Sequence, residues 1–175
     1  MAIRSFKGVT PKLGKDAYID ESAVVIGDVA LGEDASIWPV CSIRGDVNLI
    51  RIGARSNIQD GSVIHVTRRH SDLEEGYATR IGSDVTVGHK VMLHGCTVED
   101  LCLIGMGSIV LDGAIIRSKV LLGAGSLVPE GKELEGGYLW LGRPAKKMRE
   151  LTVQELQWFQ YSAQHYVKLK NDYMA

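Results

Sequence analysis

The chain has 175 residues, of which 45% are hydrophobic, and it carries a formal net charge of −1 at pH 7. This length and apolar content suffice for one domain with a sizeable core, so we predict a single domain over residues 1–175. The near-neutral charge gives no electrostatic basis for binding nucleic acid or a membrane surface.

The opening segment, MAIRSFKGVTPKLG, lacks the apolar stretch of a signal peptide, and no segment of the chain is long and apolar enough to span a bilayer. We therefore expect a cytoplasmic protein. Cys41, Cys96 and Cys102 are odd in number and lack the spacing of paired zinc ligands. Reduced, buried thiols are the expectation for such cysteines.

An aliphatic residue recurs about every six positions through most of the chain. An α-helix needs a period near 3.6 and a strand a period near 2, so a period of six predicts short strands joined by tight corners. Three units of six make one triangular coil, and stacked coils form a β-solenoid, expected at about residues 11–135. The aliphatic positions are Ile19, Val25, Leu31, Ile37, Ile43, Ile52, Ile58, Ile64, Ile81, Val87, Leu93, Val98, Ile104, Val110, Ile116, Leu122 and Val128.

Two insertions interrupt this spacing, one of three residues within Val47–Arg51 and one of eleven residues between Ile64 and Ile81. After Val128 the turn-rich segment PEGKELEGG is expected to end the solenoid.

A helix is predicted over residues 152–173, packed along the solenoid. Thr152 and Glu155 form a capping box at its start. The residues at helical spacing are Leu156, Phe159, Ala163, Tyr166, Val167 and Lys170.

The same spacing assigns polar residues to the sides of the triangular prism. Arg44, His65 and His94 each directly follow the inward aliphatic residue of the first side, so we expect them to stack outward in one column. Asp60 and His89 share a position on the third side. In a trimer packed about the prism axis, the first side of one subunit would face the third side of its neighbour, and three imidazoles would meet there.

Three imidazoles with an open fourth position form a ligand set of catalytic zinc, whose bound water ionises near neutral pH. We therefore predict a metal site of His65, His89 and His94 in a homotrimer. Zn²⁺ is the expected ion, with Fe²⁺ or Co²⁺ as alternatives. His70 and His165 are expected to be surface or interface residues.

Several motifs carry a resemblance to a known family: IRGD (Ile43–Asp46), NIQDGSVIH (Asn57–His65), VGHKVMLHG (Val87–Gly95) and LGRPAK (Leu141–Lys146). With the C-terminal helix, they make the chain resemble the gamma-class carbonic anhydrases, specifically their short bacterial homologues, over nearly its whole length. The resemblance implies a left-handed parallel β-helix of hexapeptide repeats with a C-terminal α-helix. It also implies reversible hydration of carbon dioxide to bicarbonate by a metal-bound hydroxide.

The resemblance further implies roles for individual residues. His65 and His94 would bind the metal from one subunit, and His89 from the adjacent one. Gln59 would hydrogen-bond the metal-bound hydroxide, and Asn57 matches a further polar position of the motif.

Arg44 would pair with Asp60 across the subunit contact and lie near bicarbonate, because its fork of donors suits a planar oxyanion. An interface ion pair without catalytic duty is the alternative for both residues. Tyr161 is the candidate for a helix tyrosine that reaches the metal pocket, and ordinary packing is its alternative.

The chain departs from the family where enzymes of this class carry glutamates that pass protons to solvent. Val47 stands at one of these positions and Arg68 at the other. Because hydration exports one proton per turnover, this loss is expected to slow the reaction. Glu74, Glu75 or His70 in the loop at residues 66–80 are candidate replacements.

Two other functions fit the same repeats. The first is a coenzyme A-dependent acyltransferase or thioesterase of the hexapeptide-repeat superfamily, for which one histidine serves as base and no metal is needed. The set of three histidines favours the anhydrase over this class. The second is a metal-binding protein with little anhydrase activity, which the missing glutamates keep open.

Overall fold

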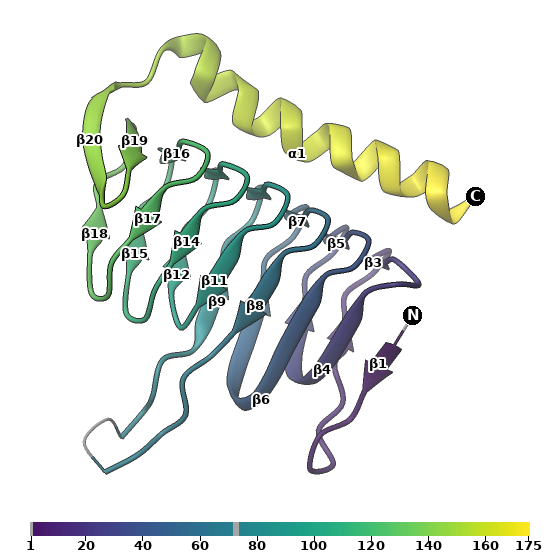
Figure 1. Cartoon of the computed structure of the whole chain (residues 1–175). Coiled ribbons are helices and arrows are strands. Elements are labelled where there is room, and N and C mark those ends of the chain that lie inside the picture. Colours follow the sequence, from purple (N-terminus) through teal and green to yellow (C-terminus); the bar gives the residue numbers. More distant parts are fainter. Residues whose placement is uncertain (1, 72–73) are drawn as a thin grey trace.

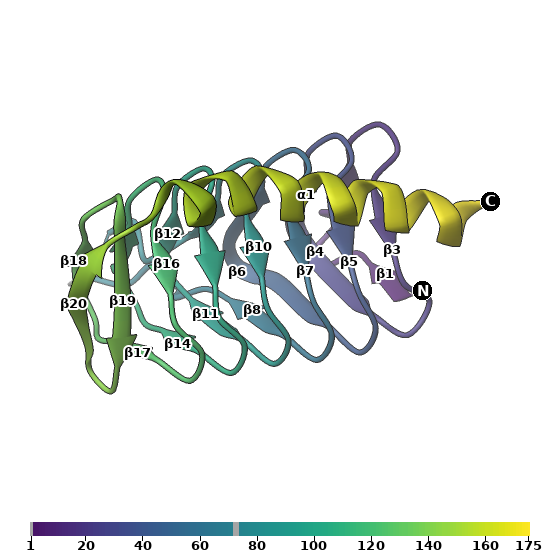
Figure 2. The same ribbon diagram turned by 90° about the horizontal axis from the view of Figure 1, so that it is seen from above.

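The computed structural model describes residues 2–71 and 74–175, and it is a parallel β-solenoid followed by a C-terminal helix, α1 (Figure 1). The predicted solenoid is therefore confirmed. Successive coils stack along one axis, and α1 runs along the length of the stack (Figures 1 and 2).

Short strands form the three sides of the prism. The first side consists of β1 (Ala2–Arg4), the first halves of β4 (Val24–Leu31) and β6 (Ser42–Ile52), β8 (Val63–His65), β11 (Met92–His94), β14 (Ile109–Val110) and β17 (Leu127–Val128). The second side consists of β2 (Lys12–Leu13), the second halves of β4 and β6, β9 (Thr79–Ile81), β12 (Thr97–Val98), β15 (Ile115–Ile116) and β18 (Glu133–Leu134). The third side consists of β3 (Tyr18–Ile19), β5 (Ser36–Ile37), β7 (Asn57–Ile58), β10 (Thr86–Val87), β13 (Leu103–Ile104), β16 (Leu121–Leu122) and β19 (Tyr138–Gly142).

The predicted inward aliphatic residues stack on one another between coils. On the first side, Ile64 pairs with Ile43 on one neighbour and with Leu93 on the other. All three are fully buried. Burying one such side chain stabilises the fold by about 1.5–3 kcal/mol, so the column is the main source of stability. The six-residue spacing in the sequence thus predicts this stacked aliphatic column correctly.

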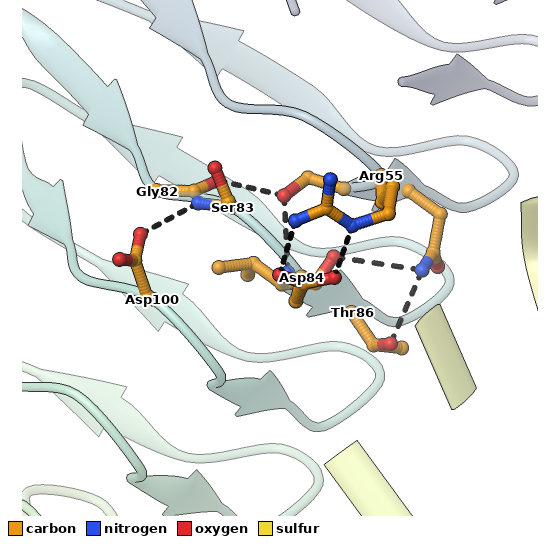
Figure 3. Close-up of polar contacts among 9 residues, drawn as sticks. Arg55, Gly82, Ser83, Asp84, Thr86 and Asp100 are labelled. Carbon is orange, nitrogen blue, oxygen red and sulfur yellow. Dashed lines mark hydrogen bonds and ion pairs between the residues drawn. The ribbon is translucent and has the colours of Figure 1, made fainter. Parts of the chain in front are cut away.

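Polar side chains brace the corner between the second and third sides (Figure 3). Arg55 donates two hydrogen bonds of 2.7 Å to Asp84 on the next coil, and Asp100 accepts the Ser83 backbone N–H at 2.7 Å. On each coil a residue with positive φ turns this corner, and these residues are Asp16, Asp34, Arg55, Asp84, Leu101, Lys119 and Gly137. The strands are therefore joined by tight corners, as predicted.

The solenoid continues beyond the predicted end near residue 135. Leu134 stacks on Ile116 and Trp140 stacks on Leu122, which extends the six-residue spacing after Val128. The tryptophan is not aliphatic and Leu134 lies among charged residues, so neither stood out in the sequence. Strand β20 (Ala145–Glu150) then pairs antiparallel with β19 and closes this end of the stack.

Helix α1 spans Val153–Met174 and begins with the predicted capping box of Thr152 and Glu155. Hydrogen bonds from Arg149 and from the Thr152 backbone lower the pKa of Glu155 to about 2. The helix packs against β5 and β10 on the third side. Within residues 2–71 and 74–175, no helix has the length and apolar character that crossing a bilayer requires.

The buried face of α1 differs in part from the predicted one. Phe159, Ala163 and Lys170 are buried as expected and Tyr166 and Val167 are partly buried, whereas Leu156 is 37% exposed. Ser162 is buried instead, because its hydroxyl hydrogen-bonds the Thr86 hydroxyl at 2.9 Å. The spacing of apolar residues cannot predict the burial of a polar residue such as Ser162.

Lys170 fastens the end of α1 to the solenoid. It is fully buried, and its Nζ lies 2.8 Å from Asp34. Breaking a fully buried pair costs about 3–5 kcal/mol, and Asp34 retains some solvent contact, so we expect Lys170→Met to lower the free energy of unfolding by about 2 kcal/mol. Denaturant unfolding measures this, with Lys168→Met on the exposed face as control. Equal stability of the two variants would contradict a role for the ion pair.

Candidate metal centre

His65 and His94 lie side by side on the first side of the prism, as the spacing predicts. Strands β8 and β11 pair in parallel, and the register places His94 directly beside His65. The Nδ1 atom of His65 lies 3.0 Å from the Nε2 atom of His94. Both rings are half-buried, so the two nitrogens are partly shielded from water.

A carboxylate holds the other nitrogen of each ring. The Nε2 atom of His65 lies 3.0 Å from Asp46, and the Nδ1 atom of His94 lies 2.6 Å from Asp112. An ionised carboxylate only accepts hydrogen bonds, so each of these ring nitrogens carries the proton. The two nitrogens that face each other therefore both present lone pairs, an arrangement that a cation between them would stabilise.

This geometry fits a zinc ion. Two imidazole nitrogens bound at about 2.0–2.1 Å to a tetrahedral zinc are about 3.3 Å apart, close to the spacing seen here. Ligand histidines in proteins typically donate their second N–H to a carboxylate, which is the pattern of Asp46 and Asp112. His65 and His94, with their carboxylate partners, would therefore suit a zinc ion as two ligands in the correct tautomer.

The local electrostatics keep His65 available as a ligand. Burial lowers its pKa, and the hydrogen bond to Asp46 only partly opposes this. Burial also acts to raise the pKa of Asp46, but hydrogen bonds from His65 and Arg44 outweigh it and hold that pKa below its ordinary value. At neutral pH the imidazole is therefore neutral and the carboxylate charged, as metal binding requires.

His89 lies elsewhere, on the third side, where it pairs with Asp60 at 3.1 Å and is half-exposed. In the described part of one chain, no three His, Cys, Asp or Glu side chains gather into a group that would hold a metal. The described part of one chain therefore does not bring His65, His89 and His94 together, and a site shared between subunits stays a prediction.

Gln59 and Asn57 form a buried network that reaches the helix. Gln59 donates from Nε2 to Asn57 at 3.1 Å, and Asn57 donates to the Thr86 hydroxyl at 3.1 Å. Thr86 in turn bonds Ser162 of α1. The network fixes the orientation of the Gln59 amide, next to Asp60 and on the same side of the prism as His89.

Arg44 stands beside the histidine column and forms an ion pair with Asp46 of its own chain. Its expected pairing with Asp60 concerns a neighbouring subunit and stays a prediction. Val47 is 43% exposed at the first position where a relay glutamate was expected, and Arg68 is exposed at the second. His70, Glu74 and Glu75 are exposed too, so none of these loop side chains is buried beside the histidines.

Tyr161 lines a cavity of about 600 Å³ between α1 and the third side, together with Gln59 and Gly88. Its ring stacks on that of His165, with 6.2 Å between the ring centroids. Tyr161 is thus on the face of the helix that borders Gln59, while remaining 58% exposed.

The three cysteines are free and buried, as expected. Burial raises the pKa of Cys41 to about 11 and those of Cys96 and Cys102 to about 12. Because only a thiolate is a good ligand or nucleophile, these side chains are inert at neutral pH.

Sequence reasoning missed Asp112. The residue lies one coil after His94 and one position further along the same side, since Val110 stacks on Leu93. A search for carboxylates within one coil of each predicted ligand would have found it.

The comparisons with known proteins bear on this arrangement. No family model matches the chain. Protein YrdA of Escherichia coli is 55% identical over 98% of this chain and 94% of its own length. A carbonic anhydrase of Geobacillus kaustophilus is 43% identical over 99% of this chain and 91% of its own length. Mitochondrial relatives from Arabidopsis thaliana are named gamma carbonic anhydrases.

Among solved structures, a hexapeptide transferase family protein from Anaplasma phagocytophilum superposes with a TM-score of 0.91. It is 41% identical, and the match covers 98% of each chain. This solved relative therefore shares the whole fold with this protein.

Proposed function

Because the chain belongs to the gamma-class carbonic anhydrase family, we propose that it catalyses the reversible hydration of carbon dioxide to bicarbonate at a metal site between subunits. The observation that carries this proposal is the pair of facing lone pairs on His65 and His94, each fixed by a carboxylate. A zinc ion bound there would lower the pKa of a coordinated water to about 7.

Within this proposal the third ligand, His89, comes from a neighbouring subunit of a homotrimer. The first side supports such a contact, because Val63 and Met92 lie in register beside the histidines and remain 38% and 42% exposed. A third side packed over these apolar residues would bury them and bring its own His89 toward His65 and His94. The site is incomplete without the second copy.

The polar residues around the histidines have separate roles in the proposal. Gln59 is held by Asn57 through its Nε2, which leaves the amide oxygen to accept a hydrogen bond from the hydroxide that a bound metal would hold. The Arg44 guanidinium provides donors for the planar bicarbonate product. Tyr161 borders the cavity beside Gln59 and would limit the access of bulk water.

An acyltransferase is the second candidate function, favoured by a solved Bacillus cereus relative that is named a putative acetyltransferase and is 41% identical with a TM-score of 0.92. Acyl transfer from coenzyme A needs a single base. It does not explain why two histidines, each hydrogen-bonded to a carboxylate, lie in contact. The third candidate function is that of a metal-binding protein with little anhydrase activity.

A stopped-flow hydration assay on anaerobically purified, zinc-replete protein separates these functions. The anhydrase proposal predicts a rate that disappears on metal removal and returns with zinc. A zinc-replete protein with no hydration rate, or one that acylates amines from acetyl-coenzyme A, would contradict it.

The Arg44–Asp60 pair gives a prediction about assembly. Removing one partner of a buried ion pair costs about 3–5 kcal/mol, and less where water enters. We therefore expect Asp60→Ala to raise the trimer dissociation constant, and metal to be lost as a consequence. Sedimentation equilibrium tests this, with the exposed Asp16→Ala as control. A trimeric, metal-loaded Asp60→Ala protein that lacks only turnover would instead place Asp60 in the chemistry.

A further inference from the structure

We propose that the segment inserted between β8 and β9 holds Asp112, and through it His94, in the orientation that binds metal. The proposal rests on His94 being a metal ligand, as proposed above. Asp112 uses its two carboxylate oxygens differently. One accepts the Nδ1–H of His94 at 2.6 Å, and the other accepts the hydroxyl proton of Thr67 from the inserted segment.

The inserted segment is anchored where Thr67 leaves the prism. The backbones of Thr67 and Tyr77 pair antiparallel, with N–O distances of 2.9 and 3.1 Å in the two directions. Asn48 of β6 donates through Nδ2 to the carbonyl groups of Thr67 and Glu75, at 3.1 and 2.9 Å. The base of the segment is therefore a fixed structure, and the described residues beyond this base project away from α1 (Figure 1).

Two glycines make room for this base on the prism. Gly95 and Gly113 lie on successive coils with φ of +56° and +69°. A Cβ atom at Gly95 would lie 2.7 Å from the Tyr77 Cβ atom and 2.4 Å from Asp112 Oδ1, and one at Gly113 would lie 3.0 Å from the Tyr77 ring. Any side chain at Gly95 would thus displace either Tyr77 or the carboxylate that His94 uses.

These contacts connect the segment to the chemistry of His94. With Thr67 in place, the carboxylate of Asp112 is held at both oxygens and stays in the plane that accepts the Nδ1–H. Asp112 then keeps the Nε2 atom of His94 unprotonated and directed at His65. Asp112 and Thr67 are positioning residues in this account, since neither contacts the substrate.

The tautomer of His94 is the readout that a merely structural role would not change. In metal-free protein with ¹⁵N-labelled histidine, long-range ¹H–¹⁵N correlation spectra show which ring nitrogen carries the proton. We expect the wild-type ring to be protonated at Nδ1, and Asp112→Ala to shift the ring toward protonation at Nε2. Thr67→Val should give a mixture of the two forms, and Thr67→Ser should restore the wild-type spectrum.

Zinc affinity, measured by competition with a chelator, is the second readout. Loss of a partner that orients a ligand typically weakens metal binding about 10–100-fold, and we expect Asp112→Ala and Thr67→Val to fall in this range. Thr97→Val and Asp100→Ala are the matched controls. Thr97 lies on the second side, and the Asp100 carboxylate accepts a backbone N–H at the braced corner (Figure 3). Circular dichroism establishes that each variant is folded.

The proposal is overturned if Asp112→Ala and Thr67→Val keep the wild-type tautomer and zinc affinity while folded. If the wild-type protein itself binds no zinc, the proposed function fails. The tautomer in the metal-free protein still decides whether Asp112 and Thr67 set the state of His94.

Discussion

Replacing His89 with alanine is expected to remove bound zinc as completely as replacing His94, although the two residues lie on different sides of the prism. His94 has the other predicted ligand of its own chain, His65, at 3.0 Å, whereas His89 pairs with Asp60 among the described residues. A zinc ion left with two protein ligands loses one of the three bonds that catalytic sites use, so both variants should lose most of their metal.

Metal content after dialysis, measured by atomic emission, tests this result. His165→Ala is a suitable control, since this histidine is exposed on α1 and lies outside the predicted ligand set. Full metal content in the His89→Ala protein would remove His89 from the ligand set, and with it the reason for placing the site between subunits.

Proton export is expected to limit the rate of the wild-type enzyme. Each hydration releases one proton, and general acid–base groups placed to carry such protons typically contribute about 10²–10⁴-fold. Val47 and Arg68 occupy the positions where proton-carrying glutamates are expected. Neither side chain can take up and release a proton at neutral pH. Small buffers such as imidazole should therefore raise kcat about tenfold in a saturable way, without changing kcat/KM.

Val47→Glu should reduce this dependence on buffer, because Val47 is exposed directly after Asp46, the partner of His65. Val153→Glu at the exposed start of α1 serves as the control for an added carboxylate. A wild-type kcat that is already high and independent of buffer would show that another group, such as His70 or Glu74, carries the proton.

The period of six predicted the interior of the protein and the neighbours of each outward residue. A residue that follows an inward aliphatic must stack on its counterpart one coil away, so the contact of His65 with His94 follows from spacing alone. The same spacing places His89 on the third side of the prism, away from this pair on the first side. The aliphatic spacing is reliable because a slip of one residue would expose the buried column.

The sequence did not predict contacts that depend on side chains reaching across coils or out of insertions. Asp112 reaches His94 from the next coil, and Thr67 reaches Asp112 from a segment whose base depends on Asn48. The buried Lys170 was expected to face the solenoid, but its ion pair with Asp34 was not foreseen, because the two residues are far apart in sequence. Such pairs leave no periodic signal.

Co-assembly of His89→Ala and His94→Ala subunits tests the central claim most directly. Each variant alone lacks every site, but a mixed trimer contains one contact where an intact His65–His94 pair meets an intact His89. Random mixing of equal amounts should therefore restore about a quarter of the wild-type zinc and hydration rate, since each mixed trimer regains one site in three. Mixed trimers verified by native mass spectrometry that regain neither zinc nor activity would contradict a site shared between subunits.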